Sequence, residues 1–397
     1  MAQPEIVARL GFWGVRGSTP TVDRANWRYG GNTPCLELIT PEGAHFILDC
    51  GTGLRMLGNK RVQKYGSKPM SAHVFVTHYH WDHIQGIPFF APLYSEQNSL
   101  HFYSFRSEAL GRNSLQRMFE AQMATPYFPV DVNAMAARRQ FTEIEGGESF
   151  AINGTRITTR WLNHPQGCLG FRFETAAGTV VYATDNEPGD KTFDKSLREL
   201  AAGADILVND AQYTREQLQS SRKGWGHSSW QDGVDIAKEV GVRNLVLFHH
   251  DPESTDRIVD GRLREARQQL ESVWAAAEGM VISLCDRAAS VTLRNSRTGL
   301  RRDAQFAATV SGFTREGKAF TEETLVHDLS LNGASFTLSH LPQLQAEVEM
   351  VLRTSGKDGR EGEMRFRGHI IHRDPVGDSG PVSVGIIFSD DPENPAG

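Results

Sequence analysis

The sequence has no long apolar run and little net charge for its length. No stretch of about 18 consecutive apolar residues occurs, so no membrane-spanning helix is expected. The first residues show no basic block followed by an apolar block, so no signal peptide is predicted and a cytoplasmic location is expected. The formal net charge is -6 over 397 residues. Charge therefore predicts no general affinity for nucleic acid.

Cysteines are few and far apart. No two of them form a Cys-x-x-Cys pair, so neither a zinc ribbon nor a disulfide framework is predicted. Buried thiols in a reducing cytosol are the expectation, and the composition is typical of a soluble globular protein. The four residues are Cys35, Cys50, Cys168 and Cys285.

One short stretch, Thr-His-Tyr-His-Trp-Asp-His at 77–83, is dense in metal-binding side chains. It follows the apolar run 72–76, which predicts a buried strand whose end points several side chains at one spot. Imidazole and carboxylate are ligands for zinc, and also for manganese and iron. Isolated histidines are usually core or surface residues, but this clustering predicts a metal site. Its candidate ligands are His78, His80, Asp82 and His83.

The spacing His-x-His-x-Asp-His resembles the signature of the metallo-β-lactamase superfamily. The family pattern continues with a His, an Asp and a His, and His164, Asp185 and His249 each follow a strand-like apolar run. The resemblance covers residues 5–290 and implies an α/β fold, an αββα sandwich. It is closest to the ribonuclease Z and phosphodiesterase branch, because the fourth ligand is His164 and not a cysteine, and because of Gly-His-Ser-Ser at 226–229.

The resemblance also implies how the ligands divide. One metal ion would be held by His78, His80 and His164, the other by Asp82, His83 and His249, with Asp185 bridging the two. The expected cofactors are thus two divalent ions, with zinc favoured over manganese or iron. His250 stands next to His249 as an alternative ligand, although the strand register before it favours His249.

Three further roles are implied by the same resemblance. His227 would donate a proton to the leaving group, and Asp210 would orient it. A helix-start histidine facing solvent is the plainer reading of His227. Asp49, at the end of the strand predicted for 45–48, would support the metal loop through hydrogen bonds without binding metal.

The implied activity is hydrolysis of a small phosphodiester such as a cyclic nucleotide. A metal-dependent ribonuclease is the first alternative, and a non-catalytic protein that responds to cyclic di-GMP is the second. Structured RNA is the less favoured substrate, because the chain shows no Gly/Pro-rich arm and no basic patch. The sequence leaves the oligomeric state open, with a homodimer among the options.

Two helices and one irregular region are predicted around these motifs. Residues 95–147 read as irregular apart from a helix at 114–123, and either a lid or a packing insertion fits them. Ser229 and Asp232 form a capping box that opens a helix. A longer charged helix is predicted for 256–277.

The length predicts more than one domain, because single cores stop growing near roughly 250–300 residues. A polar linker at 295–299 divides a metallohydrolase domain, 1–294, from a second domain, 295–397. No helical pattern follows the linker, so a small β-barrel is predicted. Its short strands are expected at 307–310, 324–327, 334–337, 346–352, 364–371 and 382–388.

This second domain resembles PilZ, a bacterial signalling domain that binds cyclic di-GMP. Asp-Leu-Ser-Leu-Asn-Gly at 328–333 matches one of its motifs. The other motif, Arg-x-x-x-Arg, is incomplete because Gln305 stands where the second arginine is expected. A guanidinium fork binds phosphate and stacks on purines, and Gln lacks its charge. Weak cyclic di-GMP binding is therefore predicted, with no binding and a structural docking role for the barrel as the alternative. The candidate contacts are Arg297, Arg301, Arg302, Asp328, Ser330 and Gly333.

Overall fold

The computed structural model describes residues 6–293, 306–314, 316–330, 333–339, 342, 346–355, 361–375 and 382–388. The chain divides into two compact units, Met1–Arg297 and Thr298–Gly397. The boundary predicted between 294 and 295 lies outside the described residues. Within the described part of the chain, no helix has the length and apolar character needed to cross a membrane.

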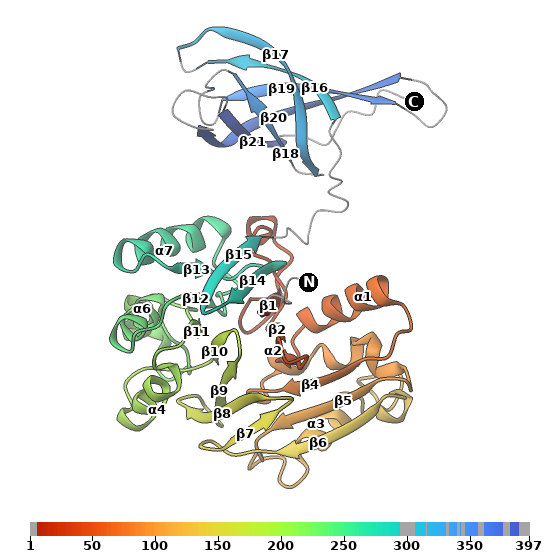
Figure 1. Cartoon of the computed structure of the whole chain (residues 1–397), viewed down its shortest axis with the longest axis vertical. Coiled ribbons are helices and arrows are strands. Elements are labelled where there is room, and N and C mark those ends of the chain that lie inside the picture. Colours follow the sequence, from red (N-terminus) through yellow and green to blue (C-terminus); the bar gives the residue numbers. More distant parts are fainter. Residues whose placement is uncertain are drawn as a thin grey trace. The chain divides into compact units, whose positions relative to one another are not determined.

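The first unit is an αββα sandwich, as predicted (Figure 1). One sheet has eight strands in the order β15-β14-β1-β2-β3-β4-β5-β6. These are β1 (Val7–Gly14), β2 (Cys35–Ile39), β3 (His45–Leu48), β4 (Ser71–Phe75), β5 (Ser99–Ser104), β6 (Arg138–Glu143), β14 (Met280–Cys285) and β15 (Ala288–Leu293). The other has seven, in the order β13-β12-β11-β10-β9-β8-β7. These are β7 (Ser149–Ile152), β8 (Thr155–Leu162), β9 (Cys168–Thr175), β10 (Gly178–Ala183), β11 (Ile206–Asp210), β12 (Leu245–Phe248) and β13 (Val273–Ala275).

Helices cover the outer faces of the two sheets (Figure 1). Apolar residues of α1 (Gly53–Tyr65) and α3 (Ser114–Gln122) pack on the first sheet, and those of α4 (Lys191–Ala201), α6 (Trp230–Glu239) and α7 (Asp256–Gln269) pack on the second. The short helical segments are α2 (Trp81–Ile84), α5 (Arg215–Gln217), η1 (Arg24–Asn26), η2 (Ile87–Phe89), η3 (Ala91–Tyr94), η4 (Val132–Ala134) and the π-helical turn η5 (Leu218–Arg222).

Aromatic rings fill the space between the sheets. Phe75 of β4 packs edge-on against Phe171 and Phe173 of β9, with ring centroids 5.1 and 5.5 Å apart. All three rings are fully buried. Such pairs add to the free energy gained by burying the rings themselves, so the two sheets form one continuous core.

Parallel pairing places the functional loops at one edge of each sheet. Strands β3 to β6 pair in parallel, as do β10 to β13. The carboxyl ends of neighbouring parallel strands meet, and this is where ligands bind in open α/β sheets. β4 leads into 77–83, β10 into Asp185 and β12 into His249, while Asp210 ends β11.

Two predictions of secondary structure were wrong. Residues 95–147 are not simply irregular, because β5 and β6 lie there and extend the first sheet in parallel. Both strands are short, and β6 carries one apolar residue, Phe141, so its sequence gives little strand signal. The expected helix at 256–277 ends at Gln269, and Val273–Ala275 forms β13 instead. Pairing with β12 overrides the helix propensity of the alanines. The capping box of Ser229 and Asp232 is present.

The second unit is a closed barrel in the order β16-β17-β18-β21-β20-β19, so the predicted small barrel is confirmed. Buried apolar residues from every strand fill it, among them Val310, Phe336 and Met350. Each strand found overlaps one of the six predicted short strands. They are β16 (Phe306–Phe313), β17 (Ala319–Ser330), β18 (Gly333–Leu338), β19 (Glu347–Ser355), β20 (Glu361–Pro375) and β21 (Val382–Phe388).

Candidate metal centre

The seven predicted ligands lie together although they come from four separate loops. Strand β4 supplies the loop with four of them, and β8, β10 and β12 each supply one just after the strand ends. Six are buried, and His80 is partly exposed. Asp210 and His227 form a further group with Asp185 and His249, in which one possible ligand atom of each residue lies within 4.8 Å of the others.

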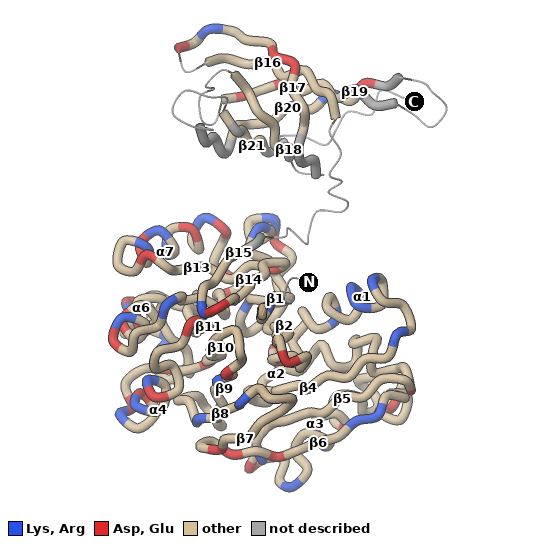
Figure 2. The backbone as a smooth tube through the Cα atoms, in the orientation of Figure 1, with Lys and Arg blue, Asp and Glu red and all other residues tan. Residues whose placement is uncertain are grey.

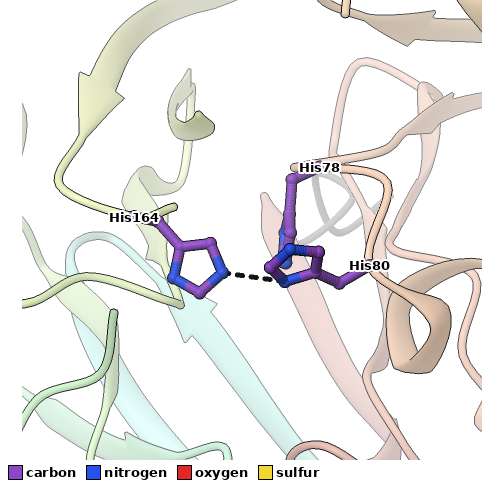
Figure 3. Close-up of side chains that lie close together, drawn as sticks. All are labelled: His78, His80 and His164. Atoms are coloured by element: carbon purple, nitrogen blue, oxygen red, sulfur yellow. Dashed lines mark hydrogen bonds between the residues drawn. The ribbon is translucent and has the colours of Figure 1, made fainter. Parts of the chain in front are cut away.

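The first predicted group is His78, His80 and His164 (Figure 3). His80 Nδ1 and His164 Nε2 face each other at 3.0 Å, approaching from opposite loops. His78 Nε2 is buried, and it has no hydrogen-bond partner among the described residues. Three ring nitrogens therefore converge on one point.

The second predicted group is Asp82, His83 and His249. His249 Nε2 lies 3.2 Å from both His83 Nε2 and Asp82 Oδ2. Asp185 stands between the two groups and gives one oxygen to each. Its Oδ1 is 3.8 Å from both His78 Nε2 and His164 Nε2, and its Oδ2 is 3.3 Å from His83 Nε2 and 3.4 Å from His249 Nε2.

Hydrogen bonds outside the cluster orient every imidazole. Each ring donates one N–H to an oxygen, so in the neutral form its other nitrogen is a bare lone pair facing the centre. The pairs are His78 Nδ1 with Thr77 Oγ1 (3.0 Å), His80 Nε2 with Gln166 Oε1 (3.2 Å), His83 Nδ1 with Asp49 Oδ2 (2.8 Å), His164 Nδ1 with Gly226 O (2.7 Å) and His249 Nδ1 with Gln212 Oε1 (2.8 Å). Lone pairs facing one another repel unless a cation lies between them, so the residues fit a metal ion.

Burial adjusts the charge state of these rings. Burial lowers the pKa of His164 to about 4 and that of His78 well below its ordinary value. Both are therefore neutral near pH 7, which is the form that binds metal. Burial also opposes protonation of His83, but Asp82 and Asp185 raise its pKa well above the ordinary value. The carboxylates thus stabilise a positive charge within the second group.

Asp49 supports the metal loop from beneath, where the sequence placed it. It is fully buried, and its oxygens accept bonds from Thr77 N (2.8 Å), from His83 Nδ1 (2.8 Å) and from the hydroxyl of Tyr182 (2.7 Å). Tyr182 belongs to β10 in the other sheet. Asp49 therefore joins the two sheets directly under His83.

His227 and Asp210 form a buried pair beside the cluster. His227 Nδ1 lies 2.8 Å from Asp210 Oδ2. Burial would lower the pKa of His227, but Asp210 raises it to about 9. His250 points elsewhere, since its Nε2 bonds Ala276 O at 2.9 Å, and burial together with Arg16 lowers its pKa to about 3. The geometry thus favours His249 over His250 at the site.

Several residues that touch this site carried no sequence signal of their own. Gln212 orients His249, and Gln166 accepts from His80. The backbone N–H of Ser18 donates to Asp82 Oδ2 at 2.8 Å. Gln212 follows Asp210 by two positions, and this proximity is the one feature of the local sequence that places any of these residues near the site. The other two come from loops whose approach depends on the fold.

The candidate cyclic di-GMP contacts are only partly within the described residues. Asp328 and Ser330 lie on β17 and Gly333 begins β18, and these strands pair at Ser330 and Gly333. Arg297, Arg301, Arg302 and Gln305 lie outside the described residues.

Comparison with known proteins agrees with this architecture. The family model for the beta-lactamase superfamily domain matches residues 45–250, more than half of the chain, and the PilZ domain model matches 295–396. Ribonuclease Z from Haloarcula marismortui is 24% identical over 316 residues, covering 68% of this chain and 95% of that protein.

Solved structures are similar in fold. The metallo-beta-lactamase fold protein YhfI from Bacillus subtilis superposes with a TM-score of 0.53 at 19% identity, covering 70% of this chain and all of that one. A diphosphatase of the PhnP family gives a TM-score of 0.50 at 18% identity, covering 70% and 99%. At these identities the similarity shows the fold alone.

We predict that Asp49→Asn weakens zinc binding by roughly 10- to 100-fold, as is usual for a partner that orients a ligand. Asparagine has one acceptor oxygen, so its NH₂ group would face the N–H of His83 or the donors on the other side. The dissociation constant is measured by competition with a chromophoric chelator.

The matched control is Asp190→Asn. Asp190 caps α4 by accepting from Thr192 N, and asparagine caps a helix equally well. Its zinc affinity should equal that of the unmodified protein. A folded Asp49→Asn protein with undiminished zinc affinity would contradict the role assigned to Asp49.

Proposed function

The chain belongs to the metallo-β-lactamase superfamily and carries a C-terminal PilZ domain, and from this premise we propose that it is a phosphodiesterase with two divalent metal ions. The substrate is a small phosphodiester such as a cyclic nucleotide. The metal is zinc, with manganese or iron as the alternatives. The observation that carries the proposal is the position of Asp185, with one carboxylate oxygen toward each group of histidines.

The ligand roles follow from this geometry. His78, His80 and His164 would hold one ion, Asp82, His83 and His249 the other, and Asp185 both. Two bound ions supply a hydroxide near neutral pH and neutralise charge on a phosphoryl group.

The protein's own proton donor is His227. Asp210 accepts from Nδ1, which leaves Nε2 to hold a proton for the departing oxygen. Burial would lower the pKa of the ring, but Asp210 raises it above the ordinary value, which favours the protonated form. Asp210 orients the ring and balances its charge.

A ribonuclease is the second candidate, and two observations favour it. Ribonuclease Z proteins of Haloarcula marismortui and Haloferax volcanii are 24% and 25% identical to this chain over 68% of its length. Residues 50–81 contain no Asp or Glu, and α1 and the turn after it carry a run of cations (Figure 2). These cations, which the sequence analysis did not recognise as a patch, are Arg55, Lys60, Arg61, Lys64 and Lys68.

Relative catalytic efficiency separates the two candidates. We expect kcat/KM for cyclic nucleotides to exceed that for precursor transfer RNA. The reverse order would favour the ribonuclease, and a phosphate-backbone contact at α1 would then appear as a strong dependence of KM on salt.

We also propose that the PilZ domain binds cyclic di-GMP weakly and regulates the hydrolase. Regulation requires that the ligand bind two states of the protein unequally. In the non-catalytic alternative, the PilZ domain binds cyclic di-GMP but the first domain hydrolyses no substrate. A cytoplasmic location completes the proposal, and light scattering on the purified protein decides between a monomer and a homodimer.

Elemental analysis should find about two metal ions per chain, and the loaded protein should hydrolyse bis(p-nitrophenyl) phosphate and members of a cyclic-nucleotide panel. Replacing both Asp82 and Asp185 by Ala removes the carboxylates between the histidines. We expect this double variant to lose metal and activity together. A full metal complement in that variant would refute the dinuclear site.

His227→Ala should lower the rate by roughly 10²–10⁴-fold while the metal is retained, which is the usual contribution of a general acid. The loss should be large for a poor leaving group such as an alkoxide. It should be small for p-nitrophenolate, which departs without a proton. Equal losses for both leaving groups would remove His227 from proton donation.

Calorimetry on the segment 295–397 should detect cyclic di-GMP binding with a dissociation constant above about 1 μM, weaker than roughly −8 kcal/mol. Gln305→Arg restores the second guanidinium and should tighten it. Sub-micromolar binding by the unmodified segment would show that Gln305 is no defect.

A further inference from the structure

An exposed tryptophan stands at the start of the loop that carries His227. Trp225 is 52% exposed, although it lies only two residues before that buried histidine. The guanidinium carbon of Arg222 lies 4.4 Å from the centroid of its ring. Arg222 ends η5, and π-helical turns of this kind occur often at functional sites.

A chain of ring contacts connects this tryptophan to the metal centre. Arg222 also lies over Tyr213, at 5.6 Å from the ring centroid. Tyr213 is buried, and its ring packs edge-on against His227 with centroids 5.9 Å apart. Arg222 thus stands between an exposed indole and a phenol that touches His227.

The loop is held firmly in place. One carboxylate, that of Glu187, accepts from Gly224 N and from Gly226 N, both at 2.8 Å, so it binds the backbone on both sides of Trp225. Gly226 O in turn accepts from His164. Because the backbone on both sides of Trp225 is already fixed, a ligand that binds the indole pays little entropy for ordering this loop.

The charge of Arg222 is also available. Among the ion pairs of the described residues, no carboxylate oxygen lies within 4 Å of its guanidinium, whereas the nearby Arg215 pairs with Asp232 and Asp235. Burial of apolar surface does not explain the pair either, because the indole remains half exposed. An exposed aromatic face beside a free cation suits a planar ring that carries a phosphate.

We propose that Trp225 and Arg222 form a subsite for a nucleobase, so that the substrate is a nucleotidyl phosphodiester. The base stacks on the exposed indole. Arg222, which lies over both Tyr213 and Trp225, holds the indole in place and adds positive charge next to the phosphate. Stacking on an aromatic side chain tolerates every base, so the subsite selects nucleotides without selecting a sequence. The inference rests on the proposed phosphodiesterase and specifies its substrate class.

Binding of two probes to the full-length, zinc-loaded protein tests the subsite. Adenosine 5′-monophosphate and ribose 5-phosphate share sugar and phosphate and differ in the base. Calorimetry should show the nucleotide binding about 10-fold more tightly or better, because stacking of one base contributes that much. In Trp225→Leu this ratio should fall to about one, with the affinity for ribose 5-phosphate unchanged; Trp225→Phe should keep part of it.

Arg222→Gln should weaken binding of both probes and reduce their ratio. Its matched control is Arg267→Gln on α7, where the guanidinium carbon lies 5.2 Å from the ring centroid of Trp274. The control removes the same charge and the same kind of contact from a helix that supplies none of the proposed ligands, so both affinities should remain unchanged.

The outcomes separate the subsite from the activity. Equal affinities of the unmodified protein for the two probes, or a ratio that survives Trp225→Leu, would overturn the subsite even if bis(p-nitrophenyl) phosphate is hydrolysed. Base-dependent binding that requires Trp225, in a protein that hydrolyses no phosphodiester, would keep the subsite and refute the phosphodiesterase.

Discussion

The buried carboxylate of Asp49 is the contact that joins the loop of candidate ligands to both sheets. A buried charge is costly unless its hydrogen bonds are satisfied, and here Thr77, His83 and Tyr182 satisfy them from two different sheets. The backbone of Asp49 accepts a φ of 61° to reach them. The carboxylate therefore connects the two sheets and orients His83 through the same set of hydrogen bonds.

The inward-facing imidazoles, unlike the bonded carboxylate of Asp49, lie in an arrangement that can be unfavourable. His80 and His164, and likewise His83 and His249, bring ring nitrogens within 3.0 and 3.2 Å of each other, an arrangement that repels when both are bare lone pairs. The protein tolerates this because each ring is held by a separate acceptor behind it. When both rings of a pair are neutral, a cation between them would replace this repulsion by coordination.

The short strands after the linker predicted the barrel, and the resemblance to the metallo-β-lactamase superfamily implied the sandwich and the ligand candidates. Apolar runs mark the strands, and His164, Asp185 and His249 follow them directly. What failed depended on contacts distant in sequence. β5 and β6 are strands because β4 offers a parallel edge, and β13 is one because β12 does. The acceptors Gln166 and Gln212 could not be identified for the same reason, since no spacing records which loop approaches which ring.

The loop at 222–229 carries both the proposed proton donor, His227, and the proposed base-binding residue, Trp225. A Cβ on Gly226 would lie 2.2 Å from His164 Nδ1, and its φ of +84° is one that side chains other than glycine rarely adopt. The glycine is therefore required where the loop supports a candidate ligand. The next residue is His227, and the preceding one is Trp225. A ligand held by the indole must then lie at a fixed distance from the imidazole and from His164, because the same few peptide groups position all three. A base stacked on the indole, as proposed, would therefore also help to align the attached phosphate for the proposed reaction.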